Sequence, residues 1–426
     1  MERPVAIVGG GVAGLACAVE LQRAGVPYVL LEAGDRVGGR VKTDIVDGFR
    51  LDRGYGVYFE AYPHLARLLD PEDLELGAFD RGAAFVDGKG MHTLAEPKSP
   101  VGALRMLFDR SVGLSDKLLL RKWTGQVRGQ TIEGLRSSGD SPTAEHLRGY
   151  GFSDEFTRGF LRPFLAGVSL DRSLGFSRQQ FAFVWKMVSE GKTGLPKEGM
   201  EAVPRLLAEG LAPGAIRTYS RVAAIEHSPA GAVTGVRLET RERIEARAVV
   251  LACDPSVAGE LLGEAIPAEY LGSTTLWFQA GAAPGPGKLL ILNGTGSGIV
   301  NHVSPNSAAQ PSYAPRGSHL VGVSILGVRP EGDDELAETV RKELAKLLPD
   351  AGAALYRLLR VDRIERAHLV ETPGFRSRAP KVETGRPNVF LAGEVTANAS
   401  LDGAAESGIR AANRAMAASP AALAAA

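Results

Sequence analysis

Three glycines and one acid near the start of the chain are spaced as in a dinucleotide-binding site. Gly9, Gly11 and Gly14 fit the pattern Gly-x-Gly-x-x-Gly, and Glu32 follows them. In this pattern the first glycine permits a tight turn, the second lets a pyrophosphate approach the backbone, and the third lets a helix pack closely. A carboxylate at the position of Glu32 accepts hydrogen bonds from an adenosine ribose and disfavours a 2′-phosphate. These residues predict binding of the ADP half of NAD or FAD.

The segments around these glycines predict the strand, helix and strand that such a site requires. Residues 5–8 and 28–31 are short apolar runs typical of buried strands, and residues 15–24 have the apolar spacing of a helix. The N-terminal N–H groups of that helix, with their partial positive charge, would face the phosphates. This context favours a dinucleotide site over an ordinary glycine-rich turn.

A second glycine pair follows the acid directly. Gly38, Gly39 and Arg40 can bring the loop back to the pyrophosphate, where the arginine would neutralise charge. The alternative interpretation is a surface turn that carries a solvated arginine.

The chain resembles, at both ends, the superfamily of FAD enzymes that contains amine oxidases, phytoene desaturases and protoporphyrinogen oxidases. The glycine loop, the acid and Gly-Gly-Arg match at the N-terminal end. Pro-Asn-Val-Phe-Leu-Ala-Gly-Glu at 387–394 and Gly-Ala-Ala-Glu-Ser-Gly at 403–408 match at the other. The resemblance implies an α/β fold with a Rossmann-like FAD-binding domain of the GR2 type and an inserted α+β substrate domain. It also implies non-covalent FAD, since the matching motifs near the ring contain no His or Cys.

The resemblance carries cofactor contacts onto particular positions. Residues 48–56 resemble the segment beside the isoalloxazine ring, although Tyr55 has a purely structural role as an equal alternative. Val222 would meet the adenine through its backbone, Glu394 would contact the ribityl–pyrophosphate region, and the helix beginning at Gly403 would direct N–H groups at the flavin pyrimidine. The predicted cofactor-binding residues are Gly9, Gly11, Val12, Ala13, Gly14, Glu32, Ala33, Gly38, Gly39, Arg40, Gly54, Tyr55, Gly56, Val222, Gly393, Glu394, Leu401, Gly403 and Ala404.

Changes of pattern along the chain predict alternating cofactor and substrate segments. We expect residues 1–77, 195–265 and 356–418 to build the FAD-binding domain. The remaining predicted segments are a helical substrate or lid region at 78–194, a substrate-domain sheet at 266–355 and a disordered tail at 419–426. In the helical region, Phe156, Phe160 and Phe164 recur on one helix face, a stripe more typical of a core than of a ligand contact.

Composition argues against several classes of protein. Lys and Arg number 49, as do Asp and Glu, and no basic run with interleaved aromatics suggests nucleic-acid binding. Two cysteines make no disulfide framework, and the sequence contains no metal-binding motif. We expect a cytoplasmic protein without a membrane span. The apolar, basic stretch 101–123 could make weak peripheral membrane contact, but an ordinary pair of lid helices is favoured. Oligomeric state is not predicted.

The expected chemistry comes from the flavin, because no triad, paired carboxylates or metal cluster stands out and no catalytic side chain is predicted. Residues 274–278 lack the lysine that amine oxidases usually carry on a substrate-domain strand, and residues 398–402 lack an aromatic. The desaturase and porphyrinogen oxidase branches are therefore closer. We expect hydride removal from, or isomerisation of, a hydrophobic polyene, quinone or porphyrinogen-like molecule. The alternatives are a flavin amine or amino-acid oxidase that releases peroxide, and a non-catalytic flavin-bound carrier or regulatory protein.

Overall fold

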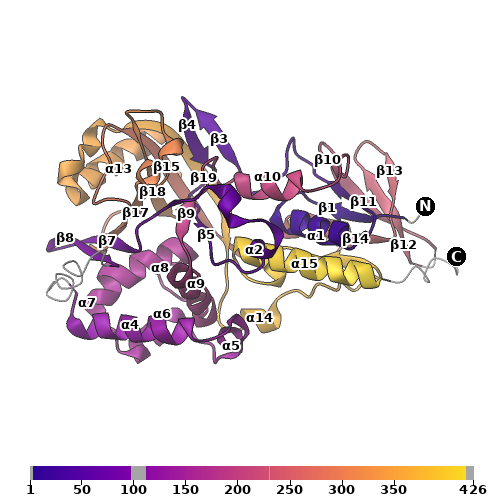
Figure 1. The fold of residues 1–426 in the computed structure, drawn as a ribbon, viewed down its shortest axis with the longest axis horizontal. Coiled ribbons are helices and arrows are strands. Elements are labelled where there is room, and N and C mark those ends of the chain that lie inside the picture. Colours follow the sequence, from indigo (N-terminus) through magenta and orange to yellow (C-terminus); the bar gives the residue numbers. More distant parts are fainter. Residues whose placement is uncertain (1–2, 97–111, 230, 419–426) are drawn as a thin grey trace.

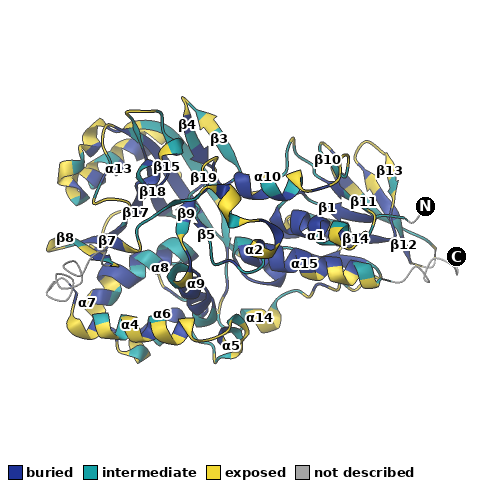
Figure 2. Ribbon diagram, in the orientation of Figure 1, coloured by how far each residue is buried: buried dark blue, intermediate teal, exposed yellow. Residues whose placement is uncertain are grey.

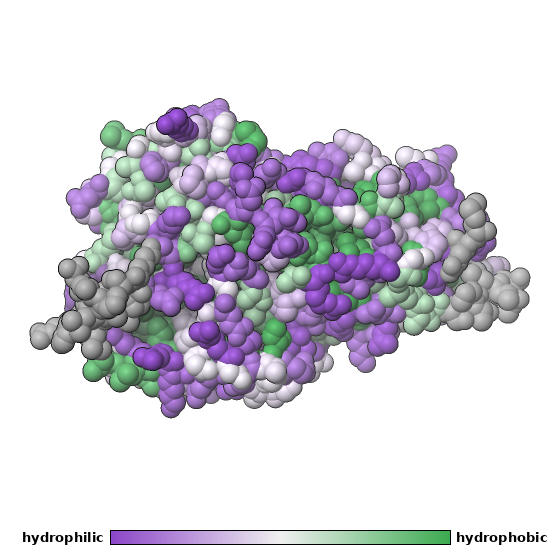
Figure 3. Space-filling view, viewed as in Figure 1, coloured by the Kyte–Doolittle hydropathy of each residue, from purple (hydrophilic) through white to green (hydrophobic). Residues whose placement is uncertain are grey.

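The computed structural model describes residues 3–96, 112–229 and 231–418 and has two lobes (Figure 1). One lobe, on the right of the view, holds a parallel sheet, with the first described strand and the last described helix in it. The other holds a larger, mostly antiparallel sheet and a group of helices. Buried residues fill the interior of both lobes, and exposed residues lie on the outer faces (Figure 2). The visible surface mixes hydrophilic and hydrophobic residues (Figure 3).

The first lobe is built on five parallel strands in the order β10-β2-β1-β14-β20. Their bounds are β1 Val5–Val8, β2 Tyr28–Leu31, β10 Ile216–Arg217, β14 Ala248–Leu251 and β20 Val389–Leu391. The chain leaves β1 toward β2 and β10, then returns to the other side of β1 with β14. Such a reversal of strand order opens a crevice at the carboxyl ends of the strands, where ligands of α/β sheets bind.

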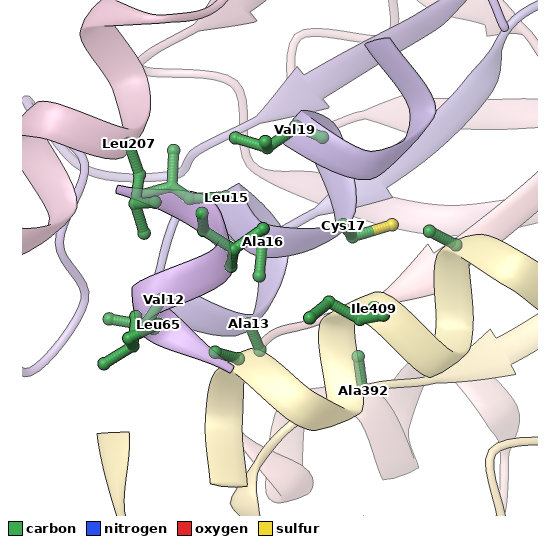
Figure 4. Close-up of a cluster of buried hydrophobic side chains, with 14 of the residues drawn as sticks. Val12, Ala13, Leu15, Ala16, Cys17, Val19, Leu65, Leu207, Ala392 and Ile409 are labelled. Carbon is green, nitrogen blue, oxygen red and sulfur yellow. The ribbon is translucent and has the colours of Figure 1, made fainter. Parts of the chain in front are cut away.

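Helix α1 (Val12–Arg23) follows β1 and packs against α15 (Leu401–Ala417). Figure 4 shows Ala13, Ala16 and Cys17 on the side of α1 that faces Ile409 of α15. The two helices approach so closely that a Cβ on Gly408 would lie 2.1 Å from the carbonyl oxygen of Ala13. Helix α1 begins three residues earlier than its apolar spacing predicts, because the glycine-rich turn is itself part of its first turn.

Smaller elements complete this lobe and its link to the other one. Strands β11, β12 and β13 form an antiparallel sheet, β3 pairs with β4, and β9 lies between β5 and β6. The bounds are β3 Thr43–Val46, β4 Phe49–Asp52, β5 Tyr58–Phe59, α2 Leu65–Leu68, β6 Gly77–Ala78, β9 Thr193–Leu195, α10 Ala202–Glu209, β11 Val222–His227, β12 Val233–Leu238, β13 Arg243–Glu245 and α11 Pro255–Leu262.

The second lobe contains a seven-stranded sheet, which we call the substrate sheet. The strand order is β19-β15-β18-β17-β16-β7-β8. One face packs against the apolar side of α13 through Leu336, Val340 and Leu344, and the other carries polar residues such as Thr275 and Ser324. The bounds are β7 Gly82–Asp87, β8 Gly90–Ala95, β15 Tyr270–Ala280, β16 Leu290–Asn293, β17 Val300–Ser304, α12 Asn306–Ala309, β18 His319–Leu326, α13 Asp333–Leu347, β19 Arg357–Leu369 and α14 Phe375–Arg378.

Helices α4 to α9 form the lower part of this lobe in Figure 1 and surround an aromatic core. The ring of Phe160 stacks on Phe156 at 5.3 Å and on Phe164 at 6.2 Å between centroids, which confirms that the phenylalanine stripe belongs to the core. The bounds are α4 Leu114–Arg128, α5 Ile132–Ser137, α6 Thr143–Tyr150, α7 Asp154–Phe156, a π-helical turn Thr157–Leu161, α8 Arg162–Ser169 and α9 Arg178–Glu190.

The structure differs from the predicted segmentation in two places. Strands β7 and β8 lie in the segment predicted to be helical, and β7 pairs in parallel with β16. Strand β19 lies in the segment predicted for the FAD-binding domain, yet it pairs with β15 in the substrate sheet. Charged residues interrupt the apolar pattern of β19, with Arg at every third position from Arg357 to Arg366, and obscure the period of two that indicates a strand. The tail at 419–426 and much of the stretch 101–123 lie outside the described residues. Within the described part of the chain, every helix is too short or too polar to cross a membrane.

Candidate cofactor groove and adjoining cavity

A groove of about 560 Å³ opens at the carboxyl ends of the parallel strands and extends to the substrate sheet. We call it the cofactor groove. Of the predicted cofactor contacts, all except Gly14 and Gly403 line it. Segments far apart in the sequence therefore meet along one elongated surface, as the binding of an extended dinucleotide requires.

The glycine turn forms one end of this groove for steric reasons. Gly9 has a φ of +108°, and a Cβ there would lie 2.6 Å from the carbonyl oxygen of Ala252. A Cβ on Gly14 would lie 2.0 Å from the carbonyl oxygen of Gly9, so Gly14 serves helix packing and not ligand contact. At Gly11, by contrast, nothing in the described chain lies within 4 Å of such a Cβ. Gly11 therefore faces the groove and leaves room for a ligand.

The N-terminus of α1 is available to an anion. Gly11 is its N-cap residue, and among the described residues no side chain caps this end and no acid lies in the first turn. The backbone at Val12 and Ala13 lines the groove. An uncapped helix N-terminus with room above it fits a pyrophosphate.

The carboxylate of Glu32 is held in place by the backbone at the edge of the groove. It accepts hydrogen bonds from the N–H of Gly10 and from the N–H of Gly34, each at 2.7 Å. Carboxylate oxygens have further lone pairs, which leaves Glu32 able to accept from ribose hydroxyls. Val222 lies in the same wall, beside Ser220 and Arg221, which the sequence analysis did not single out although they adjoin the matching motif.

Arg40 and Glu394 form an ion pair across the middle of the groove. Burial works against its charge, but the nearby carboxylate of Glu394 raises the pKa of Arg40 above its ordinary value. The guanidinium of Arg40 also lies 5.7 Å from the ring centroid of Tyr270, and that of Arg366 lies 4.5 Å from the same ring. Tyr270 was missed because it stands at the start of a strand, with no motif around it. The pair places a cation in the groove while its charge is balanced by the carboxylate of Glu394.

The segment 52–57 joins the two lobes beside the groove. Gly54 has a φ of +81°, and a Cβ there would lie 2.5 Å from Cδ1 of Ile364. The N–H of Gly54 donates to Asp362 at 3.2 Å. Tyr55 lines the groove and makes an edge-to-face contact with His302 at 4.7 Å between centroids. Tyr55 thus has the structural contact that the sequence left as an alternative, and it still borders the groove.

The start of α15 carries the N–H groups that we expect to face the flavin pyrimidine. The N–H of Gly403 donates to Oγ of Ser400 at 2.8 Å, and the N–H of Ala404 donates to the carbonyl oxygen of Ser400 at 3.0 Å. Both N–H groups already have partners within the chain, and their donation to a flavin pyrimidine stays a prediction. A Cβ on Gly403 would lie 2.2 Å from the carbonyl oxygen of Asn398, so this glycine is required for packing. Sequence could not distinguish a packing glycine from a contact glycine at this position.

Two nucleophile-bearing residues outside the predicted motifs, Cys253 and His368, also line the groove. Burial raises the pKa of the Cys253 thiol to about 12 and lowers the pKa of His368. A protonated thiol is a poor nucleophile.

Acid denaturation of the FAD-loaded protein should therefore release all of its FAD into the supernatant. Flavin colour that stays with the precipitated chain would contradict non-covalent binding.

A second cavity, of about 610 Å³, adjoins the cofactor groove, and Leu170 and His368 line both. It lies between the α8–α9 region and the end of the substrate sheet. The buried part of its wall holds three apolar residues, Phe176, Ile325 and Leu369, and three polar ones, Ser169, Gln180 and Glu371. We call it the side cavity. Its size is typical of a small-molecule site.

Glu371 lines the side cavity and is 5% exposed. Its Oε1 accepts a hydrogen bond from the N–H of Ala399, which lines the cofactor groove. Burial raises the pKa of Glu371 to about 8, although this N–H works in the opposite direction. The sequence analysis missed Glu371 because no motif surrounds it.

This shift makes the stability of the protein depend on pH. The folded chain keeps the proton of Glu371 to about pH 8, whereas the unfolded chain loses it near the ordinary pKa, so stability falls as pH rises across that window. Between pH 6 and pH 8 the wild type should lose about 2 kcal/mol more than Glu371→Gln does. Urea unfolding at both pH values measures the difference. Parallel losses in the two proteins would contradict a protonated Glu371.

Comparisons with known proteins agree with this geometry. The family model of flavin-containing amine oxidoreductases matches residues 12–416. Phytoene dehydrogenase of Streptomyces griseus is 27% identical, with 92% of this chain and 89% of that protein covered. Hydroxysqualene dehydroxylase of Rhodopseudomonas palustris is 26% identical, covering 98% and 99%. The crystal structure of a putative protoporphyrinogen oxidase from Exiguobacterium superposes with a TM-score of 0.71 at 20% identity, covering 97% and 98%.

Proposed function

The chain belongs to the family of flavin-containing amine oxidoreductases, and on that premise we propose that this FAD-dependent oxidoreductase removes a hydride from a largely apolar substrate. The observation that carries the proposal is the side cavity, which shares Leu170 and His368 with the cofactor groove and has Phe176, Ile325 and Leu369 in the buried part of its wall. A substrate in this cavity would lie next to the segment of the groove that we assign to the flavin ring.

The residues around the groove fit FAD. The uncapped start of α1, the open space at Gly11 and the fixed carboxylate of Glu32 suit a pyrophosphate and a ribose. When bound, FAD would supply the two-electron acceptor for a hydride that leaves a substrate carbon. The proton lost from the neighbouring carbon as the double bond forms would pass to solvent. The chain itself contributes position, charge balance and exclusion of water.

Helices of the second lobe would exclude water from the side cavity. Helices α8 and α9 lie against the end of the substrate sheet, and the loop between them, with Leu170 and Phe176, walls the side cavity. Packing of Phe164 against Trp185, at 5.9 Å between ring centroids, joins the two helices. A dry cavity strengthens the electrostatic interactions inside it and protects a reduced flavin from side reactions.

The lining of the groove favours an apolar substrate over a simple amine. Strands β15 and β18 of the substrate sheet line the groove with Tyr270, Ser273 and Ser324. Among the described lining residues the only lysine, Lys42, lies at the opposite end, beside Glu32. The groove thus offers no lysine at the position where the resemblance to amine oxidases would require one. The names of the two curated relatives, which refer to phytoene and hydroxysqualene, point in the same direction.

Anaerobic reduction of the bound flavin tests the proposal. The yellow protein would be mixed in the absence of oxygen with phytoene, a porphyrinogen or a quinol, and separately with putrescine or benzylamine. We expect at least one apolar donor to bleach the visible flavin band, and the amines to leave it unchanged. Bleaching by the amines alone would contradict the proposal and favour an amine oxidase. A flavin that no donor reduces would favour a non-catalytic carrier.

A further inference from the structure

We propose that Gln180 and Glu371 anchor an uncharged hydrogen-bonding group, a hydroxyl or a carbonyl, at one end of the otherwise apolar substrate held in the side cavity. This inference rests on the proposed function, because it takes the side cavity as the substrate site. It narrows the substrate class from hydrocarbons in general to apolar molecules with one polar terminus.

The placement of these two side chains supports an anchor. Both line the side cavity, and both are more than nine-tenths buried: Gln180 is 6% exposed and Glu371 is 5% exposed. The buried part of the cavity wall also holds the apolar residues Phe176, Ile325 and Leu369 and the polar Ser169, whereas the other charged lining residues are less buried: Asp171, Arg172, Glu269 and Arg329. A few polar groups in an apolar cavity are the usual means by which a protein orients a ligand.

Both anchor residues are tied to the same point of the cofactor groove. The N–H of Ala399 donates to Glu371, and the carbonyl oxygen of Ala399 accepts from Nε2 of Gln180 at 3.3 Å. Ala399 lines the cofactor groove and immediately precedes Ser400, the N-cap residue of α15. The anchor is therefore fixed to the scaffold that forms the groove, and its distance from a flavin there is set by the fold.

Burial, which raises the pKa of the anchor carboxyl, outweighs two arginines that act to lower it, Arg376 and Arg136. Arg376 is exposed, and Arg136 is already paired with Glu406 through two hydrogen bonds at 3.1 and 2.6 Å. Because burial holds the pKa of Glu371 at about 8, the carboxyl is protonated at neutral pH and presents an O–H donor as well as an acceptor. A protonated carboxyl suits a hydroxyl or carbonyl better than an ammonium group.

Three probes with one isoprenoid skeleton test the inference: geraniol, geranylamine and the hydrocarbon myrcene. Each would be titrated at pH 7 into FAD-loaded protein, with the flavin absorption or fluorescence change reporting binding. Glu371→Leu and Gln180→Leu remove the polar groups, Glu371→Gln keeps a donor and an acceptor, and Glu269→Gln changes an exposed acid at the mouth of the same cavity. Flavin content and melting temperature are measured for each variant, and Gln180→Leu carries the test should Glu371→Leu fail to fold.

We expect the leucine variants to weaken geraniol binding by about tenfold or more, since a buried polar partner is lost. Glu371→Gln and Glu269→Gln should retain it, and myrcene should bind all variants alike. Equal geraniol binding by wild type and leucine variants would overturn the inference, as would failure of all three probes to bind the wild type. Geranylamine binding that exceeds that of geraniol and is lost in Glu371→Gln would instead assign a cation site. Because binding needs no turnover, these results are independent of whether any donor bleaches the flavin.

Discussion

Replacing Gly11 by valine is expected to give a folded protein that purifies without FAD. The new side chain meets nothing in the described chain within 4 Å of its Cβ, so the fold should accept it. It would, however, stand in the groove above the N-terminus of α1, where we place the pyrophosphate. We expect FAD affinity to fall by at least about 100-fold, or about 3 kcal/mol. Titration of the apoprotein with FAD, followed by flavin fluorescence, measures the loss.

Substitutions at two further glycines distinguish a loss of FAD binding from a loss of folding. Gly14→Val places a Cβ 2.0 Å from the carbonyl oxygen of Gly9 and should prevent α1 from packing, so this variant should fail to fold. Gly149→Val lies on the exposed side of α6, meets nothing in the described chain within 4 Å of its Cβ, and should bind FAD normally. Wild-type FAD affinity in Gly11→Val would place the cofactor elsewhere.

Glu406→Gln is expected to destabilise the protein by about 3 kcal/mol, because it leaves the Arg136 guanidinium buried without a counter-charge. The two side chains are only 11% and 10% exposed, and they are joined by two parallel hydrogen bonds. Although burial works to raise it, Arg136 holds the pKa of Glu406 below its ordinary value. The pair connects α5 of the second lobe to α15 of the first, so its loss should loosen the contact between the lobes.

Urea or thermal unfolding of the FAD-loaded protein measures this cost. The double variant Arg136→Met with Glu406→Leu is the matched control, because exchange of a buried ion pair for apolar residues is often close to neutral. If Glu406→Gln and Arg136→Met, each made alone, are both as stable as the wild type, the ion pair is solvated and contributes little to stability.

The elements around the glycine turn could be predicted because their signals are local. The apolar runs of β1 and β2, the glycine spacing and Glu32 all lie within one short stretch, where steric rules act directly on neighbouring residues. Burial of Phe156, Phe160 and Phe164 could be predicted for the same reason, because their spacing places them on one helix face. The family motifs at the other end of the chain predicted that Gly393 and Glu394 contact the same cofactor, and both residues line the cofactor groove.

Features that depend on distant contacts could not be read in this way. The charged side chains of strand β19 meet partners on other segments: Arg360 binds Asp44, and Asp362 accepts from Trp277. Gly403 matched a family motif, but its close approach to Asn398 emerges only in the folded loop. Glu371 becomes unusual only when the fold buries it beside Ala399, so neither its identity nor its neighbours in sequence reveal it.

A crystal structure of the FAD-loaded protein tests the central claim most directly. Electron density should place the ribose at Glu32, the pyrophosphate at the start of α1 near Gly11, and the flavin ring between Tyr55 and the side cavity. Such a position would support both the cofactor contacts and the assignment of the side cavity to the substrate. Density for FAD in another place, or a ring turned away from the side cavity, would contradict the account.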